Sequence, residues 1–314
     1  MKPIHIVLFY KFEPVEKPAL FAKKHLKFCK TLRVFGKVLV AEEGINGSIS
    51  GTPEQIEAYK KFLKSQKGFE DIAFKEEFTA NHPFTKMFVR VKKEIIRLDK
   101  KVDMRKKGTY IQPNEVLELY NKGSDFIMLD ARNYYEFDLG RFKRAVNPNI
   151  RSFREFPTFG KKFKKQIKNK NKKIVTYCTG GIRCEKASAY LKEQGFTNVY
   201  QLEGGIINFC QQLPNTVWEG KCFVFDKRLM TNLNQNNQPI TFCENCNQPC
   251  DLYRNCKNLS CDKLHIMCVA CQEKMQGCCS EECRKRFNEY VRNRAASKKE
   301  GAWIQPKILQ NYVQ

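Results

Sequence analysis

The sequence of 314 residues contains no long uninterrupted apolar run and no recognisable secretion signal. A membrane-spanning helix needs about 18 consecutive apolar residues, so neither a transmembrane span nor a membrane partner is expected. The apolar start Ile4–Tyr10 is short and leads into Lys11 and Glu13 without a small-residue cleavage site. We therefore interpret this start as a first β-strand and expect a cytoplasmic protein.

Two further absences restrict the redox chemistry that the sequence supports. A non-haem iron triad needs two histidines and a carboxylate. The four histidines are scattered, at His5, His25, His82 and His265, and each suits a structural role. Oxygen chemistry otherwise recruits flavin or haem, but the sequence has no nucleotide-binding glycine fingerprint and no flavin or haem motif.

Acidic residues are scarce relative to basic ones, and the formal net charge is +24. The excess is concentrated at 86–107, 161–173 and 284–314, and the second of these tracts holds eight lysines and no acid. A basic surface attracts polyanions, most often nucleic acid, although a lysine tract can also be a merely solvated face. We expect nucleic acid as the partner. The candidate RNA-binding residues are Lys161, Lys162, Lys164 and Lys165.

Residues 1–100 are predicted to form a small α+β domain. Strand-like and helical segments follow one another in the order βαββαβ, which is typical of a ferredoxin-like fold. Thr52 is a good N-cap and Pro53 suits the first helical position, while Glu43–Gly47 is expected to form a tight turn. The expected strands are Ile4–Tyr10, Gly36–Ala41, Gly47–Ser50 and Ile72–Phe78, and the expected helices are Lys17–Thr31 and Pro53–Lys64.

The pattern changes after Lys100–Gly108, which is charged, poor in apolar residues and suited to a linker. Nearly continuous apolar runs then alternate with helical segments at 113–122 and 185–194, as expected of α/β structure with parallel strands buried on both faces. The expected strands are Phe126–Asp130, Ile174–Tyr177 and Asn198–Leu202. We predict a parallel-sheet domain over 109–215, a cysteine-rich region over 216–290 and a basic, partly helical tail over 291–314.

Cys178 follows directly after an apolar strand, where α/β proteins place functional groups. The two glycines that follow let the backbone curl so that several N–H groups point inward, and the helix start adds partial positive charge. Together these features stabilise a thiolate and lower its pKa below the usual value of about 8.5. The predicted active-site loop is Cys178, Thr179, Gly180, Gly181, Ile182 and Arg183, with Cys178 as the nucleophile.

Two other interpretations of Cys178 remain open. A buried cysteine at a strand end is common and often has only a packing role. A cysteine-dependent phosphatase needs five residues between the cysteine and the arginine, whereas four separate Cys178 from Arg183. The shorter loop suits a sulfur carried on the cysteine better than a bound phosphate, and Arg183 either pairs with an anion or braces the turn.

Ten of the fifteen cysteines lie between 243 and 283, in closely spaced pairs. Such pairs are typical of tetrahedral zinc sites, and a segment with little apolar core would gain its folding energy from the metal. Alternatively the segment is a loosely packed loop of free thiols. One predicted site takes Cys243, Cys246, Cys268 and Cys271, and the other takes Cys256, Cys261, Cys279 and Cys283. Cys250, Cys278 and His265 can each substitute for a named ligand, whereas Cys29, Cys210 and Cys222 are assigned to packing.

Several segments resemble known families. Leu129-Asp130-Ala131-Arg132, followed by Glu136, Gly140 and Ala145, and Leu202–Ile206 resemble the first and last signatures of rhodanese domains. Asp130 and Arg132 are therefore candidate supporting residues, although a structural ion pair explains them equally well. The whole chain resembles the bacterial tRNA uridine hydroxylase family in Glu42–Gly47, Val102–Met104, the loop at 178–183 and Cys222–Asp226.

The resemblance implies oxygen-dependent conversion of the wobble uridine of tRNA to 5-hydroxyuridine, with the loop cysteine required. It also implies molecular oxygen as co-substrate and tRNA, rather than DNA, as the partner. The sequence leaves two alternatives: a small-molecule or protein sulfurtransferase with Cys178 as persulfide carrier, and a non-catalytic zinc module that binds RNA or protein. A sulfurtransferase explains the Cys178 loop but not the basic surface. In a non-catalytic zinc module, Cys178 would have no role in function.

Overall fold

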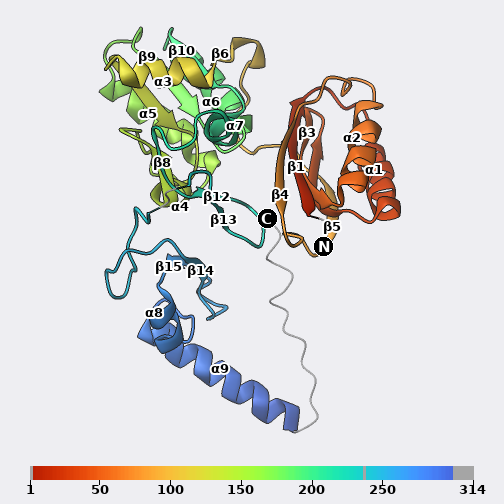
Figure 1. Cartoon of the computed structure of the whole chain (residues 1–314), viewed down its shortest axis with the longest axis vertical. Coiled ribbons are helices and arrows are strands. Elements are labelled where there is room, and N and C mark those ends of the chain that lie inside the picture. Colours follow the sequence, from red (N-terminus) through yellow and green to blue (C-terminus); the bar gives the residue numbers. More distant parts are fainter. Residues whose placement is uncertain (1–2, 236–237, 300–314) are drawn as a thin grey trace. The chain divides into compact units, whose positions relative to one another are not determined.

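The computed structural model describes residues 3–235 and 238–299, with side chains as far as residue 293. The chain forms two compact units, one ending at Gln238 and the other beginning at Pro239. The first unit contains two larger sheets with their helices and two two-stranded pairs, and the second is small and cysteine-rich (Figure 1). Residues 300–314 of the predicted basic tail lie outside the described residues.

The N-terminal part of the first unit is a five-stranded sheet with two helices. Its strands lie in the order β4-β1-β3-β2-β5, and the first four reproduce the arrangement expected of a ferredoxin-like βαββαβ fold. Both helices lie on one face of the sheet (Figure 1), over a core that includes Val7, Phe9 and Tyr59. The elements are β1 Ile4–Phe12, α1 Pro18–Leu32, β2 Phe35–Ala41, β3 Gly44–Gly51, α2 Pro53–Lys64, β4 Phe74–Thr79 and β5 Met87–Val91.

Local chemistry explains the second helix and one error in the prediction. Thr52 caps α2 as predicted, because its hydroxyl accepts the N–H of Gln55 while the Gln55 side chain accepts the N–H of Thr52. The turn predicted over Glu43–Gly47 was placed too late, because Ala41 already pairs with Gly44. Gly44 is required by close strand contact, since an added Cβ would lie 2.0 Å from the Lys11 carbonyl oxygen.

Strand β5 was not predicted from the sequence, because it lies in the basic tract 86–107 and charged residues are uncommon in strands. β5 pairs in parallel with β2 alone and carries Arg90 among its five residues, as charged edge strands often do.

The second part of the first unit is built on a four-stranded parallel sheet in the order β6-β10-β9-β7. Helices cover both faces, since α5 packs with α6 over one core and α3 with α7 over another. The predicted parallel-sheet architecture is therefore confirmed. Its elements are β6 Thr109–Ile111, α3 Pro113–Asn121, β7 Phe126–Asp130, α4 Tyr134–Leu139, β8 Gly140–Phe142, α5 Phe156–Gln166, β9 Lys173–Tyr177, α6 Ile182–Glu193, β10 Val199–Leu202 and α7 Gly205–Gln212.

The lysine tract 161–173 is not simply a connection between a helix and a strand. Its first half is the end of α5, because Phe156 and Phe163 recur at helical spacing and are buried. Beyond α7, β11 Trp218–Gly220 pairs with β8, and β12 Cys222–Phe223 pairs with β13 Met230–Thr231.

The second unit contains little regular structure. A two-stranded ladder of β14 Tyr253–Asn255 and β15 Leu264–Ile266 is followed by α8 Val269–Lys274 and α9 Glu281–Lys299 (Figure 1). The buried residues of this unit include many cysteines, but the unit begins at Pro239, so residues 216–238 of the predicted cysteine-rich region belong to the first unit.

Candidate active site and cysteine clusters

The loop 178–183 connects β9 to α6, as the sequence predicts. Cys178 lies at the carboxyl end of the buried strand and has no exposed surface. The N–H of Gly181 donates to Cys178 Sγ at 3.1 Å, and the N–H of Ile206 donates to the Cys178 carbonyl oxygen at 3.0 Å. Gly205 passes so close that an added Cβ would lie 2.5 Å from that oxygen. The predicted closing signature segment, Leu202–Ile206, therefore contacts the loop.

The surroundings of Cys178 favour its thiolate. Burial by itself raises the pKa of a thiol, but this effect is outweighed here. The Cys184 thiol donates a hydrogen bond, Arg183 contributes positive charge, and the N–H groups of Arg183 and Gly181 point at the sulfur, which together lower the pKa of Cys178 to about 5. Burial and the neighbouring Cys178 raise the pKa of Cys184 well above its usual value. One thiol of the pair is thus an anion and the other its proton donor.

Arg183 braces the loop through a buried ion pair. Its Nη1 and Nη2 lie 2.6 and 2.8 Å from the two carboxylate oxygens of Glu136, which comes from α4. Burial opposes the charge of Arg183, but Glu136 and Cys178 raise its pKa above the ordinary value. Because both terminal nitrogens of its guanidinium are already held by the Glu136 carboxylate, the geometry favours bracing over capture of a free anion.

Asp130 and Arg132 form a second ion pair that is completely buried at the end of β7. Arg132 Nη2 lies 2.6 Å from Asp130 Oδ2 and also donates to the Gly140 carbonyl oxygen at 2.6 Å. The guanidinium lies 5.2 Å from the Trp218 ring centroid. These contacts join β7, β8 and β11 and assign the pair a structural role near the loop.

Two consecutive residues of α6 connect the active-site helix to the N-terminal domain and to the segment that follows it. Lys186 Nζ lies 2.8 Å from Glu43 Oε1 and 2.6 Å from Glu94 Oε2. Glu185 Oε1 accepts the hydroxyls of Tyr10 and Tyr110, at 3.3 and 2.5 Å. The predicted motif around Glu43 therefore serves a contact with the loop-bearing helix.

The four candidate RNA-binding lysines, Lys161, Lys162, Lys164 and Lys165, are all exposed on α5. None of them makes a side-chain ion pair within the described part of the chain. Their charge is thus available to a polyanion, although exposure alone does not identify one.

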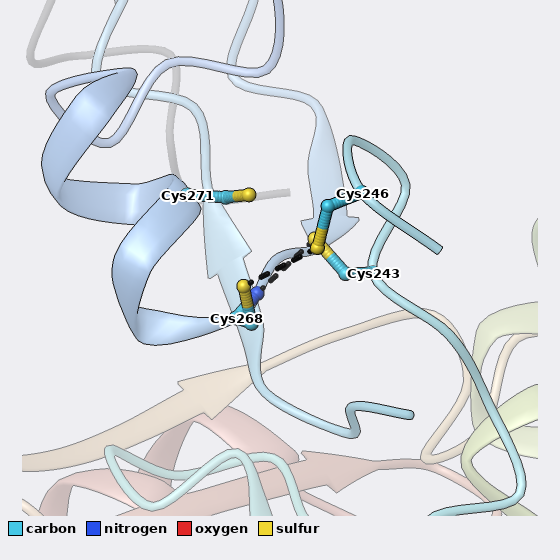
Figure 2. Close-up of side chains that lie close together, drawn as sticks. All are labelled: Cys243, Cys246, Cys268 and Cys271. Atoms are coloured by element: carbon cyan, nitrogen blue, oxygen red, sulfur yellow. Dashed lines mark hydrogen bonds between the residues drawn. The ribbon is translucent and has the colours of Figure 1, made fainter. Parts of the chain in front are cut away.

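The first predicted metal group is assembled in the second unit (Figure 2). Cys243, Cys246, Cys268 and Cys271 bring their sulfur atoms within 4.8 Å of one another. The Sγ atoms of Cys246 and Cys268 lie 3.7 Å apart, and the N–H of Cys268 donates to Cys243 Sγ at 3.4 Å. Two of these residues precede the ladder β14–β15 and two lie at the start of α8, so the ladder joins the pairs.

The second group has the same design. Cys256, Cys261, Cys279 and Cys283 also lie within 4.8 Å of one another. Neighbouring sulfurs are 3.6 Å apart for Cys261 and Cys279 and 3.7 Å apart for Cys279 and Cys283. The interleaved pairing is therefore the one that the spacing predicts. The substitutes considered from the sequence, Cys250, Cys278 and His265, are buried but belong to neither group.

The cysteines that were assigned to packing are buried, as predicted. Two residues near the loop were not predicted, because no local sequence motif marks them. Cys29, Cys210 and Cys222 are buried, and burial raises the pKa of Cys29 and Cys222 to about 12. Tyr10 and Lys75 come from the N-terminal domain and interact electrostatically with Cys178. Side chains alternate between the two faces of a strand, and this alternation along β1 and β4 was the one feature of the sequence that could have placed Tyr10 and Lys75 on the face opposite the helices.

Among the described residues, none of the helices is long and apolar enough to cross a membrane.

Comparison with known proteins covers nearly the whole chain. Three family models match, described as UPF0176 acylphosphatase like domain over residues 4–95, rhodanese-like domain over 112–212 and rhodanase C-terminal over 219–284. A curated relative from Acholeplasma laidlawii, named tRNA uridine(34) hydroxylase, is 42% identical over 93% of this chain and 93% of its own length.

Relatives with the same name show similar coverage. The protein from Bacillus cytotoxicus is 40% identical over 98% of this chain and 96% of its own length. The protein from Staphylococcus saprophyticus is 41% identical over 98% of this chain and 97% of its own length. With all three parts of the chain matched, from the first sheet through the Cys178 loop to the cysteine groups, the chain belongs to the tRNA uridine(34) hydroxylase family.

Proposed function

We propose that this protein hydroxylates carbon 5 of the wobble uridine of tRNA in the cytoplasm, with Cys178 as the essential thiolate and molecular oxygen as co-substrate. The observation that carries the proposal is the shared name of relatives that align at 40–42% identity over nearly the full chain. The site is compatible with it, because a thiolate with a pKa of about 5 is fully formed at neutral pH. Thr179, Gly180, Gly181 and Ile182 shape the loop, and Arg183 braces it.

The two four-cysteine groups are proposed to hold one structural zinc ion each. Four sulfurs at about 2.3 Å from a tetrahedral zinc ion lie about 3.8 Å from one another. The observed separations of 3.6 to 3.7 Å fit this arrangement. Each group also receives backbone N–H hydrogen bonds, as from Cys268 and Cys279, which favour the thiolate form that zinc requires. Zinc would supply folding energy to a unit that has little apolar core.

The tRNA is proposed to bind through the basic tracts, including the exposed lysines of α5. Phosphate contacts set affinity but do not select a base, so selectivity would come from the unstacked bases of the anticodon loop. The target base must leave its stack to approach Cys178.

Nucleoside mass spectrometry of tRNA tests the reaction directly. Cells that contain the protein are expected to have 5-hydroxyuridine-derived nucleosides at the wobble position, and cells that lack the gene are expected to have uridine there. Reintroducing wild-type protein should restore the modification, while the Cys178→Ser protein should not. Unchanged tRNA in the deletion strain would contradict the proposal.

The rhodanese-like loop also favours a second function, transfer of sulfur from thiosulfate to an acceptor. Purified protein that transfers sulfur rapidly but leaves tRNA unmodified in air would support this alternative. The basic surface and the separate cysteine-rich unit have no place in that reaction, which is why it ranks second.

Charge reversal of Lys161, Lys162, Lys164 and Lys165 to glutamate tests the RNA surface. The quadruple variant is expected to bind tRNA more weakly and with a shallower salt dependence, because each lost phosphate contact lowers the log–log slope by nearly one. Alkylation of Cys178 should not change, since the variant leaves the loop intact. If the variant binds tRNA as tightly as the wild-type protein does, this tract is a solvated surface with no role in RNA binding.

A further inference from the structure

The N-terminal sheet has one face covered by its own helices and one face free to contribute to the Cys178 loop. Along β1, Val7 and Phe9 are buried in the helix-covered core, so Tyr10 lies on the opposite face. Along β4, Phe74 packs against that core, so Lys75 also lies on the opposite face. Neither side chain is needed to pack its own domain.

Tyr10 and Lys75 lie directly against the glycines of the active-site loop. An added Cβ on Gly181, whose φ is +103°, would lie 2.8 Å from the Tyr10 hydroxyl oxygen. An added Cβ on Gly180 would lie 3.9 Å from Lys75 Cδ. Lys75 Nζ lies 5.3 Å from the centroid of the Tyr10 ring. The missing side chain at Gly181 therefore leaves room for the Tyr10 hydroxyl, and Lys75 reaches the loop at ordinary contact distance.

The neighbours of Lys75 on β4 hold this strand in place. Gln211 of α7 donates to the Glu76 carbonyl oxygen at 3.1 Å. Arg228, from the segment after the parallel sheet, lies 2.8 Å from Glu77 Oε1 and is itself fixed by Asp226 at 2.7 Å. The strand is thus anchored on two sides directly after Lys75, whereas the Lys75 ammonium group lies over the Tyr10 ring.

The ammonium group of Lys75 is partly buried and makes no direct ion pair within the described residues. Burial lowers the pKa of Lys75, and the negative charges of Cys178, Glu185 and Glu203 counteract that effect. A cavity of about 210 Å³ lies on another side of Lys75, lined by Ile207 and Gln211 and by no residue of the Cys178 loop. A cation without a carboxylate partner therefore lies over the Tyr10 ring and interacts electrostatically with the thiolate.

From this arrangement, and resting on the proposed function, we propose that Lys75 is a catalytic residue that donates to O4 of the target uracil while Cys178 adds to C6. Addition forms the Sγ–C6 bond and breaks the C5=C6 π bond. The electron pair moves onto O4, where the ammonium group stabilises the enolate. Carbon 5 thereby becomes nucleophilic, which is the property that hydroxylation at this carbon requires.

Without oxygen the same enolate has a measurable fate. Carbon 5 takes a proton from solvent, loses its original proton to solvent, and the thiolate leaves C6 with restoration of the double bond. The net change is exchange of the C5 hydrogen, with no oxidant or reductant. The base reaches the sulfur only if a covering side chain moves, because Cys178 has no exposed surface. Lys75 has a flexible chain and no ion pair to break, whereas Tyr10 donates to Glu185.

The test is anaerobic exchange in deuterated water, using an unmodified tRNA transcript with uridine at the wobble position and mass spectrometry of that nucleoside. Wild-type protein is expected to incorporate deuterium at C5, and Cys178→Ser should not. Lys75→Met should slow exchange by about 100-fold or more, in kcat rather than KM, because one preorganised donor is lost. Lys75→Arg should retain part of the rate. The matched control Lys64→Met, at an exposed lysine near the end of α2, should exchange as wild type does.

A second readout separates chemistry from folding. In Lys75→Met the pH of half-maximal alkylation of Cys178 should rise, because a nearby positive charge is gone, while thermal unfolding stays unchanged. If Lys75→Met exchanges the C5 hydrogen at the wild-type rate, Lys75 has no catalytic role. Normal hydroxylation in air without anaerobic exchange in the wild type would overturn the addition step and leave the proposed function intact. Absence of hydroxylation in air would remove the proposed function itself.

Discussion

Cysteine sulfur is used in two different ways in the two units of this chain. In the first unit, Cys178 is held by backbone N–H groups, by the Cys184 thiol and by an arginine that Glu136 fixes in turn. In the second unit, sulfurs are grouped in fours that lie within 4.8 Å of one another, with pairs such as Cys246–Cys268 and Cys261–Cys279 only 3.6 to 3.7 Å apart.

The two arrangements differ in what holds the sulfur atoms in position. The environment of Cys178 is built by a parallel sheet with helices on both faces, so its geometry is independent of any ion. The four-cysteine groups gather sulfurs that would repel one another as thiolates, so the proposed zinc ions would offset that repulsion. The first arrangement suits a reactive sulfur and the second a structural one, and the following predictions test that contrast.

The largest effect is expected from Cys178→Ser. Serine nearly preserves volume but does not form an anion at neutral pH, so hydroxylation should fall by about 10³-fold or more while the fold is retained. Activity is measured by nucleoside mass spectrometry and folding by thermal unfolding. As a control, Cys29→Ala removes another buried thiol, one whose pKa burial raises to about 12, and should keep full activity per folded molecule. Appreciable hydroxylation by Cys178→Ser would show that the thiolate is not essential.

Metal removal should affect the other region. Protein purified without chelator is expected to contain two zinc ions, and strong chelation should make residues 239–299 protease-sensitive, because structural zinc provides on the order of 10 kcal/mol of folding free energy. Cys246→Ser should lose one zinc ion, whereas Cys250→Ala, at a buried cysteine outside both groups, should retain two. Metal-free protein with unchanged protease resistance would contradict the assignment.

The sequence was most informative where chemistry depends on neighbours along the chain. The apolar run before Cys178 and the glycines after it predicted the strand-to-helix loop, and paired cysteine spacings predicted both four-sulfur groups. Contacts over long sequence separations were not predictable from such signals. Glu136 reaches Arg183 across 47 residues, and Lys75 lies beside the loop only because two domains pack together. Edge strand β5 was hidden by its charge.

A smaller effect is expected from Cys184→Ala. The Cys184 thiol donates to the Cys178 thiolate, and a hydrogen bond to a charged group contributes about 1.5 kcal/mol or slightly more. Its loss should move the pH of half-maximal Cys178 alkylation upward by about one unit, from near 5 in the wild type, because thiolate forms only as pH rises through the pKa. Cys184→Ser keeps a donor and should titrate closer to wild type. An unchanged alkylation profile in Cys184→Ala would assign the low pKa of Cys178 to Arg183, Lys75 and the backbone N–H groups, without a contribution from Cys184.

The smallest effect is expected from Phe225→Ala. This substitution tests whether an exposed aromatic ring near Cys178 helps to bind the target base. Phe225 lies in the segment after the parallel sheet and is 62% exposed, although its ring is large and apolar. It lies 5.2 Å from the Phe223 ring centroid and 5.9 Å from the guanidinium carbon of Arg183, at the loop.

An exposed ring beside an arginine at the mouth of the loop suits stacking with an unstacked anticodon base, which contributes about 1–3 kcal/mol. Phe225→Ala should therefore raise KM for tRNA by roughly 10-fold with little change in kcat or in Cys178 alkylation. Phe78→Ala, at a ring that is 58% exposed but stacked on His5, is the matched control and should leave KM unchanged. Equal KM values for Phe225→Ala and wild type would mean that the base is held by other groups, whereas a loss of kcat alone would place Phe225 in the support of Arg183 rather than in contact with RNA.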